Sequence, residues 1–352
     1  MLFLLVAAVL AICDPRAPSA WLDWLDWPTL AGLTGLMVAV QGIGDSALAE
    51  RAAGRLLARL HSVRAVGMAL VLASAALAMV LTNDVSLLLM VPLTLALGAD
   101  GCLPLGRLIT LEAFAVNAGS TLSPIGNPQN LLLWQHSGLG FAGFVQAMWP
   151  AACVMLALTV LLTLAWLPGT RIPRRSMPAR TTHRKLGVLS LLALAGMVLA
   201  MQWGHALAGA AIVVATYAVV ARHSLRRVDW MLLVTFAAIF VALGHLSAWP
   251  PLAALLDPLH LERSGQLYVA GIVGSQIISN VPASVLLMGY TTHETLLAVA
   301  VNVGGYGLAI GSLANLIALR LARTELTMTQ FHRVSIPFLL VCACAVYAAM
   351  LL

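Results

Sequence analysis

The sequence predicts an all-α polytopic membrane protein with two inverted repeats, each holding a re-entrant hairpin and a discontinuous helix, and about ten transmembrane spans in total. Three observations predict this fold: the composition, the positions of the basic residues and an internal repeat. Hydrophobic residues make up 61% of the 352 residues and charged residues only 9%, with a mean hydropathy of +0.96. This composition excludes a water-soluble domain.

The apolar segments give the elements in chain order. They cover residues 1–13, 28–47, 65–97, 104–133, 143–167, 187–203, 206–221, 229–247, 266–291, 294–320 and 334–352. We interpret the first as a short span rather than a signal peptide, because it lacks a basic start and a small-residue cleavage site. Segments 65–97 and 266–291 carry polar residues near their middle, and we expect each to enter and leave the bilayer on one side as a hairpin.

The Lys and Arg residues support these hairpins. If the N-terminus is cytoplasmic and both hairpins re-enter, all 19 basic residues except Arg16 and Arg263 fall on the cytoplasmic side. This asymmetry is the positive-inside pattern of membrane proteins. An ordinary span in place of either hairpin would reverse the later segments and abolish it. The sequence pI near 9.4 therefore results from basic loop residues that orient the chain in the membrane. We expect the lipid bilayer rather than a nucleic acid as partner.

The internal repeat is clearest around the most unusual stretch of the chain. NAGSTLSPIGNPQNLL at 117–132 aligns without gaps on NVGGYGLAIGSLANLI at 302–317. The identical positions include Asn117 with Asn302, Gly119 with Gly304, Gly126 with Gly311, and Asn130 with Asn315. These matches indicate an internal repeat, which is sought before any fold is assigned.

Two further matches occur in the same order. LTNDVSLLLMVP at 81–92 parallels ISNVPASVLLMG at 278–289, and LDWPTLAGLTGLMVAV at 25–40 parallels VDWMLLVTFAAIFVAL at 228–243. An odd number of predicted crossings separates the copies, so the repeats are inverted with respect to the membrane. Inverted repeats with interrupted helices are typical of secondary transporters whose binding site lies where the repeats meet.

The interrupted helices supply the first set of candidate ligands. A break inside the bilayer exposes N–H groups at one half-helix end and C=O groups at the other, which favour anions and cations respectively. Neutral polar side chains surround both breaks. They are Asn117, Ser120, Thr121, Ser123, Asn127 and Asn130 in the first copy, and Asn302 and Asn315, beside Gly304, in the second. The alternative is a Pro-kinked helix whose polar residues only join neighbouring helices.

The hairpin tips supply the second set. Thr82, Asn83 and Asp84 lie at the first tip, and Ser279 and Asn280 at the second. Arms of about 12–17 residues reach roughly 18–25 Å, which brings each tip to the middle of the bilayer. We expect both tips to meet the breaks, although such residues also occur as simple turn formers.

Only two acids fall deep in the apolar segments, Asp84 and Glu112. Asp84 suits a cation or proton site, with a helix cap as the alternative. We expect Glu112 to pair with Arg107. No dedicated metal site or cofactor is expected, and the five cysteines lack metal-ligand spacing. A bound Na⁺ ion is the exception. The residues that we expect near it are Asn83, Asp84, Asn117, Asn280 and Asn302.

One enzymatic alternative is the intramembrane aspartyl protease. Gly42-Ile43-Gly44-Asp45 matches the GxGD pattern of that class, which needs a second Asp facing the first, but no Tyr-Asp partner occurs in another span. We therefore expect a transporter and not an enzyme.

These motifs together resemble the ion transporter superfamily. The stretches NAGSTLSPIGNPQNLLL at 117–133, TND…VPL at 82–93 and SQIISNVPASVLL at 275–287 are similar to those of citrate-transporter-like permeases. More narrowly, the chain resembles ArsB/NhaD-type anion permeases, close to the YbiR inner-membrane proteins. At the third tip position, Asp84 and Val281 differ from the Thr of the dicarboxylate branch. Ala309-Ile310 differs from the Thr-Pro pair of the arsenite branch.

The resemblance implies an elevator-type carrier of the bacterial inner membrane, in which hairpins and broken helices move against a scaffold that dimerises. We expect a small anion or oxyanion as substrate and Na⁺ or H⁺ as coupling ion. The alternatives are a Na⁺/H⁺ antiporter and an arsenite efflux permease. The expected organisation is a first repeat at 1–167, a cytoplasmic basic linker with a connecting span at 168–205, and a second repeat at 206–352.

Overall fold

The structure is a computed structural model that describes residues 18–48, 51–52, 60–98, 101–172, 181–247, 249–322 and 324–351. Within these ranges the chain is helical, and the only extended pairing there is an isolated bridge between Ser62 and Arg171. The prediction of an all-α fold is confirmed. The expected first span at 1–13 lies outside the described residues.

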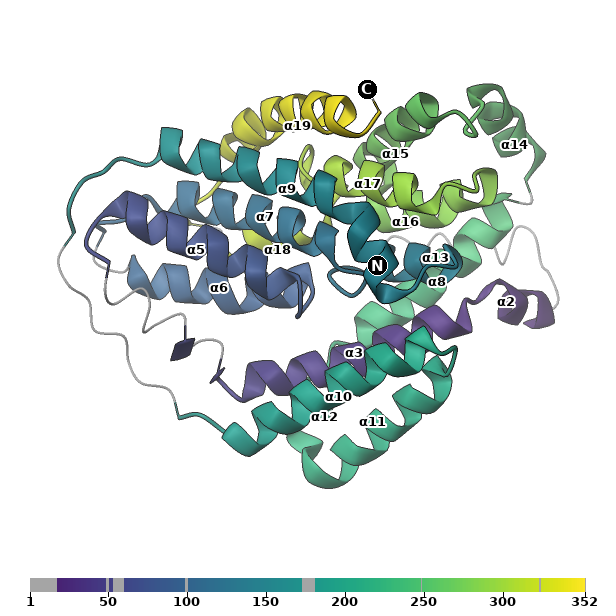
Figure 1. The fold of residues 1–352 in the computed structure, drawn as a ribbon, viewed down its shortest axis with the longest axis horizontal. Helices are drawn as coiled ribbons and strands as arrows, with labels where there is room; N and C mark the ends of the chain where they lie inside the picture. Colours follow the sequence, from purple (N-terminus) through teal and green to yellow (C-terminus); the bar gives the residue numbers. More distant parts are fainter. Residues whose placement is uncertain are drawn as a thin grey trace.

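The first half of the chain forms helices that include one hairpin and one discontinuous helix. They are α2 (Pro18–Trp24), α3 (Trp27–Asp45), α5 (Val63–Ala78), α6 (Asn83–Leu97), α7 (Leu105–Leu122), α8 (Pro128–His136) and α9 (Phe141–Trp166). Helices α5 and α6 contact each other and lie side by side as a hairpin (Figure 1). Helix α7 ends where the Gly- and Pro-rich stretch begins, and α8 resumes after it.

The second half repeats this pattern after a group of connecting helices. The connecting helices are α10 (Arg184–Gln202), α11 (Ala206–Val220) and α12 (Arg222–Arg227), and α13 (Trp230–Ser247), which aligns with α3, follows them. The remaining elements are α14 (Pro250–Leu256), η1 (Asp257–Leu259), α15 (Ser264–Ile278), α16 (Asn280–Leu287), η2 (Met288–Tyr290), α17 (Glu294–Gly304), η3 (Ala309–Gly311), α18 (Leu313–Leu321) and α19 (Met328–Leu351). Helices α15 and α16 form the second hairpin, and α17 and α18 flank the second break.

By length and composition, four of the described helices can each cross a membrane unaided. They are α9, α10, α13 and α19, the last counted over Met328–Met350. Helices α5, α6, α11 and α17 are apolar but shorter. The chain is therefore a multi-pass membrane protein, while the total of about ten spans stays a prediction.

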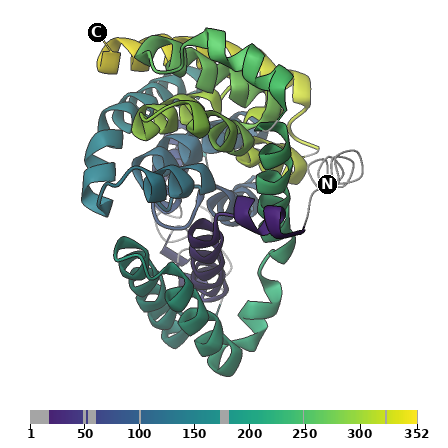
Figure 2. The same cartoon turned by 90° about the vertical axis from the view of Figure 1, so that its right-hand side faces the viewer.

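The helices form two groups in Figures 1 and 2. Helices α10, α11 and α12 pack along α3 at the bottom of both views. Both hairpins and both breaks lie in the larger group above, with α9 and α19 against them. The main hydrophobic core runs through this larger group, where Phe114, Tyr306 and Phe331 are fully buried. The core therefore lies directly around the breaks.

The repeat is visible in local geometry at the start of α3 and α13. The Asp26 side chain accepts a hydrogen bond from Thr29 N over 2.9 Å, and Asp229 accepts one from Leu232 N over 3.1 Å. Asp and Asn favour this capping position because their side chains satisfy free N–H groups at the first turn. The indole N–H of the tryptophan after each Asp also donates to a carbonyl five residues back, at 3.2 Å and 3.1 Å. The paired segments thus share their bonds as well as their sequence.

Candidate functional site at two paired helix breaks

Both helix breaks end in an extended residue that caps the next half-helix. Asn127 has φ −158° and ψ 162°, and its side chain accepts from Asn130 N; Pro128 then occupies the first turn, where no donor is needed. Ser312 has φ −144° and ψ 139°, and its hydroxyl accepts from Ala314 N. The sequence therefore stops and restarts each helix in the same way, with a short side chain at the equivalent position.

The two breaks exchange hydrogen bonds through pairs of asparagines. The amide of Asn117 on α7 donates to the Asn315 side-chain oxygen on α18 over 3.3 Å. The amide of Asn302 on α17 donates to the Asn130 side-chain oxygen on α8 over 2.6 Å. These are the same two alignment positions with the repeats exchanged. Such reciprocal contacts indicate an approximate two-fold relation between the two halves.

The same two asparagines on α8 and α18 also close their own breaks. The Asn130 amide donates to the carbonyls of Ser120, Thr121 and Ser123, each over 3.1 Å. The Asn315 amide donates to the carbonyls of Gly305 over 2.7 Å and Leu308 over 3.4 Å. Gly305 and Leu308 align with Ser120 and Ser123. Carbonyls left free by the helix break are thus satisfied inside the protein, as an apolar environment requires.

A further pair of bonds crosses between the halves. Asn127 donates to the Asn302 side-chain oxygen over 2.8 Å, and the equivalent Ser312 hydroxyl donates to the Asn117 side-chain oxygen over 3.2 Å. All these side chains are buried, with Asn130 and Asn315 at 0% exposure. Within the first break, Ser120 and Thr121 donate back to the Asn117 carbonyl over 3.2 Å and 2.7 Å. The candidate residues of both breaks therefore form one connected polar network.

Gly304, which the sequence singled out, has a packing role that it shares with Gly119. A Cβ atom at Gly119 would collide with the backbone of Ala75 on α5, and one at Gly304 would collide with the Ser275 side chain on α15. Each glycine lets the discontinuous helix approach the first arm of its own hairpin. Gly304 is therefore a point of close contact between helices rather than a ligand side chain.

The hairpin tips share an uncommon backbone conformation. Thr82 has φ 76° and ψ 148°, and Ser279 has φ 77° and ψ 157°. This region is close to one that is otherwise nearly restricted to glycine, and it costs of order 1–3 kcal/mol for other residues. At both tips the following asparagine accepts from the next backbone N–H, Asp84 N over 3.0 Å and Val281 N over 2.9 Å.

The first tip is joined to the breaks more directly than the second. Asn83 N donates to the Gly126 carbonyl over 2.8 Å. The second tip forms no equivalent bond from Asn280 N to Gly311, although α16 packs against α17 and α8. Within the described ranges, neither the Asn83 nor the Asn280 side-chain NH₂ group donates a hydrogen bond. Both tips thus hold a donor that a ligand can use.

The deep acids have different surroundings. Asp84 is 7% exposed; it does not cap α6, and its Oδ1 atom is buried without a hydrogen-bond partner. The exposed Asp229 carboxylate at the start of α13 lies within electrostatic range of Asp84. The negative charge of Asp229 disfavours the charged form of the Asp84 carboxyl, and a cation would offset this effect.

The expected pairing of Glu112 with Arg107 is wrong. Arg107 instead donates to the Trp166 carbonyl over 3.0 Å, and its guanidinium lies 5.5 Å from the Trp166 ring centroid. Glu112 is fully buried and accepts a 2.6 Å hydrogen bond from the Thr94 hydroxyl on α6. Arg107 lies near the start of α7, where its long side chain reaches the exposed end of α9 and leaves Glu112 inside the core.

Sequence reasoning missed several members of the network. Gln129 donates to Asn302 over 3.4 Å, and the Gln276 amide donates to the Gly304 carbonyl while its oxygen accepts from Leu308 N over 2.7 Å. Ser312, at the position of Asn127, was also absent from the candidates. These residues could have been identified in the sequence as uncharged polar residues inside or beside an apolar run, because a polar group in the bilayer needs a hydrogen-bond partner.

Comparisons with known proteins identify the relatives of this chain. A family described as "CitMHS: Citrate transporter" matches residues 1–293. The inner membrane protein YbiR of Escherichia coli K12 is 41% identical over 353 residues, covering 100% of this chain and 95% of YbiR. A transporter of Methanocaldococcus jannaschii is 27% identical over 337 residues, covering 94% of this chain and 91% of its own length. The silicon efflux transporter LSI3 of rice is 30% identical over 136 residues, or 38% of this chain and 28% of LSI3.

A solved structure shares the fold. The Alcanivorax borkumensis YdaH transporter, described as having an unusual topology, superposes with a TM-score of 0.58 at 15% sequence identity, over 99% of this chain and 95% of its own. The family and its relatives are transporters, so the protease alternative is rejected; Asp45 of the GxGD pattern forms an ion pair with Arg227 at 2.6 Å. The chain is a multi-pass membrane transporter that belongs to the CitMHS citrate transporter family.

Proposed function

We propose that this protein is a secondary active transporter that moves a small anion or oxyanion across the bacterial inner membrane by an elevator mechanism, coupled to Na⁺ or H⁺. The observation that supports it most is the reciprocal asparagine network between the two helix breaks. Polar groups are costly within a bilayer and are retained where they bind or conduct a substrate. Two structurally equivalent breaks, joined by these hydrogen bonds, would provide a polar binding site for a substrate inside the membrane.

The substrate side of the proposal rests on neutral donors. The half-helix N-termini of α8 and α18 begin at the breaks, and they favour anions. Helices α6 and α16, which begin at Asn83 and Asn280 with their unused NH₂ groups, pack against α18 and α8 respectively. The described residues of the tips and breaks include no Lys or Arg. Such a site suits a weakly charged or charge-compensated oxyanion, held by hydrogen bonds and a co-bound cation.

The coupling side rests on Asp84. Its buried Oδ1 atom lacks a partner, and Asp229 adds a second negative charge in range. A buried carboxylate without a partner is costly, so a cation or a proton at Asp84 would stabilise the structure. A Na⁺ ion would also need carbonyl ligands, which the chain between the end of α7 at Leu122 and the start of α8 at Pro128 would supply.

The elevator proposal follows from the two groups of helices. We assign both hairpins and both discontinuous helices to the mobile domain, because the tips and breaks pack on one another. The scaffold consists of α3, α10, α11 and α13, and we expect it to form the homodimer contact. The repeats at 1–167 and 206–352, inverted across the membrane and joined by the linker at 168–205, generate the two access states.

Two rival transport functions use the same residues. A Na⁺/H⁺ antiporter would need Asp84 but no anion site, while an efflux permease for arsenite would need the tip donors. The rice relative is a silicon efflux transporter, which adds a small oxyacid to the candidates. Uptake into proteoliposomes should be measured for citrate, succinate, sulfate, arsenite and silicate, each with imposed Na⁺ and pH gradients. Gradient-driven accumulation of one of them supports the proposal, whereas Na⁺/H⁺ exchange without transport of any of them contradicts it.

A further inference from the structure

A basic cavity lies away from the breaks, in the group of helices around α3. It has a volume of about 1020 Å³ and lies between the end of α3, the start of α10 and the junction of α11 with α12. The residues that line it include Asp45, Arg184, Lys185, Leu189, Val220 and Arg227. None of them belongs to the transport site described above.

The charges in this cavity favour an anion. Among the described residues, Asp45 is the only acid that lines it, and this acid forms an ion pair with Arg227 at 2.6 Å. Arg184 and Lys185 are exposed and form no ion pair within the described ranges. They begin the 19-residue helix α10, whose first turn receives no side-chain cap from His183. Free N–H groups and two cationic side chains at one helix start form a binding site for phosphate.

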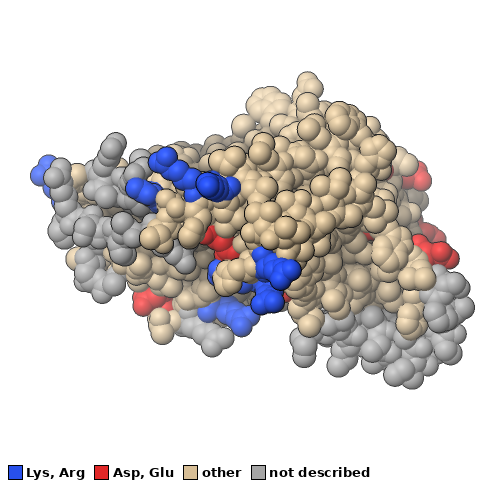
Figure 3. Space-filling view, turned by 90° about the horizontal axis from the view of Figure 1, so that it is seen from below, with Lys and Arg blue, Asp and Glu red and all other residues tan. Residues whose placement is uncertain are grey.

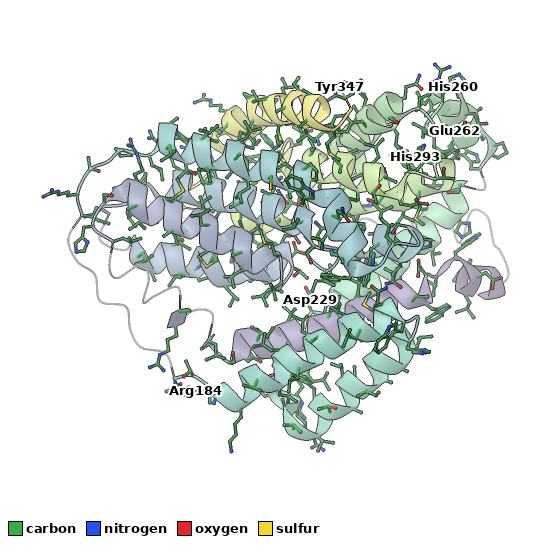
Figure 4. The ribbon with its side chains drawn as sticks, viewed as in Figure 1. Arg184, Asp229, His260, Glu262, His293 and Tyr347 are labelled. Carbon is green, nitrogen blue, oxygen red and sulfur yellow. The ribbon has the colours of Figure 1, made fainter. Side chains whose placement is uncertain are left out.

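The position of the cavity points toward a membrane surface. Figure 4 shows Arg184 at the opposite end of the molecule from His260, Glu262 and His293. On the face seen in Figure 3, the visible Lys and Arg side chains gather toward the left and centre, while Asp and Glu also appear at the right edge. Basic residues at one end of a helical bundle mark the cytoplasmic interface, where anionic lipid headgroups lie.

The cavity also has an apolar side. Val220 lines it and is 65% exposed, the adjacent Val219 is 82% exposed, and Leu189 forms part of the wall. Farther along α10, Leu192 is 67% exposed. Because α10 is long and apolar enough to cross a membrane, these side chains would lie against acyl chains directly beside the basic residues. The combination of a phosphate site with an apolar surface fits a lipid better than a free ion.

We propose that this cavity binds the headgroup of an anionic phospholipid, with Arg184 and Lys185 on the phosphate and Val220 beside an acyl chain. The bound lipid joins the end of α3 to the start of α10 and to α12. It thereby stabilises the group of helices against which the rest of the molecule packs.

The test measures thermal unfolding of the purified full chain in detergent while phosphatidylglycerol or phosphatidylcholine is added. A ligand that binds the folded state raises the unfolding midpoint by mass action. We expect phosphatidylglycerol to raise the midpoint of the wild type more than phosphatidylcholine does. R184Q/K185Q should lose this difference, with the half-saturating lipid concentration at least about tenfold higher.

Two variants control for charge and folding. R222Q/R226Q removes the same charge from α12 at positions that do not line the cavity, and it should respond like the wild type. R184K/K185R keeps both charges and should retain the response. Equal responses of R184Q/K185Q and R222Q/R226Q would overturn the proposal, since the lipid effect would then be a general charge effect. An equal midpoint rise with soluble glycerol phosphate would also overturn it, because the ligand would then be a free phosphate ester.

Discussion

Thr82 and Ser279 hold almost the same strained backbone, with φ 76° and 77°, although they lie in different halves of the chain. Each precedes an asparagine that starts the second arm of its hairpin. The reciprocal bonds of Asn117 with Asn315 and of Asn302 with Asn130 extend this equivalence to the breaks. Strained backbone that recurs at equivalent positions indicates a conformation retained for function.

Glycine at either tip should relieve the strain. Thr82→Gly and Ser279→Gly should each be more stable than the corresponding alanine variants by about 1 kcal/mol, because only glycine adopts this φ without cost. Unfolding in mixed micelles measures the difference. Alanine variants that equal the glycine variants would indicate that the tips relax to an ordinary backbone.

The bond between Asn130 and Asn302 should appear as an energetic coupling. Each single alanine variant should lose about 1–3 kcal/mol, because buried partners are left without a hydrogen bond. The double variant should lose less than the sum, with a coupling of about 0.6–1.7 kcal/mol as found for hydrogen bonds between membrane helices. Asn130→Ala combined with Thr163→Ala on α9 is the matched control, and these should be additive. Additivity of the first pair as well would mean that the bond does not form in the membrane.

Asp84→Asn should uncouple transport from the driving ion. The variant keeps the shape of the side chain but removes its charge, so accumulation against a gradient should fail while downhill exchange persists. If the coupling ion is H⁺, the pH dependence of the wild-type rate should be lost in the variant; if it is Na⁺, the Na⁺ requirement should be lost. Flux under imposed Na⁺ and pH gradients measures both. An unchanged ion dependence would assign coupling elsewhere, with Glu112 as the next candidate.

Asp229→Asn is the companion variant for the same test. It removes the second charge in range of Asp84 but leaves the Asp84 carboxyl in place. We expect a weaker apparent affinity for the coupling cation with coupling retained. A complete loss of coupling would assign the ion to Asp229 rather than to Asp84.

Cysteine labelling should establish sidedness. Leu139 and Thr170 flank the 26-residue helix α9, which is about 39 Å long and therefore spans the bilayer. In a background without native cysteines, Thr170→Cys and Arg226→Cys should label from the cytoplasm, and Leu139→Cys and Pro258→Cys from outside. Labelling of Arg226→Cys and Thr170→Cys from opposite sides would contradict the inverted repeat.

The positions of the helix breaks could be predicted from the sequence because their causes are local. Gly126 and Pro128 lie in a long apolar run. A membrane-spanning helix cannot continue unbroken across these two residues, because Pro removes a backbone hydrogen bond and clashes with the preceding turn. The alignment of the repeats likewise identified Asn117, Asn130, Asn302 and Asn315 as equivalent pairs.

The pairing of these residues across the halves could not be predicted, because it depends on how the repeats pack. Nothing in the order of residues states that Asn117 bonds to Asn315 rather than to its own copy, Asn302. Similarly, Arg107 is near Glu112 in sequence, but the carboxyl bonds to Thr94 of another helix. The electrostatic influence of Asp229 on Asp84 likewise joins residues 145 positions apart, which only the fold can reveal.

The central claim is that the tips and breaks together bind the substrate, and Asn83→Ala and Asn280→Ala test it most directly. The measurement is substrate counterflow in proteoliposomes, with the amount of inserted, folded protein determined for each variant and Thr163→Ala as the control. Each alanine removes an unused tip donor while leaving helix packing nearly intact, so counterflow should be abolished in both variants and normal in the control. Near-normal counterflow in both alanine variants would contradict the account and reduce the tips to structural turns.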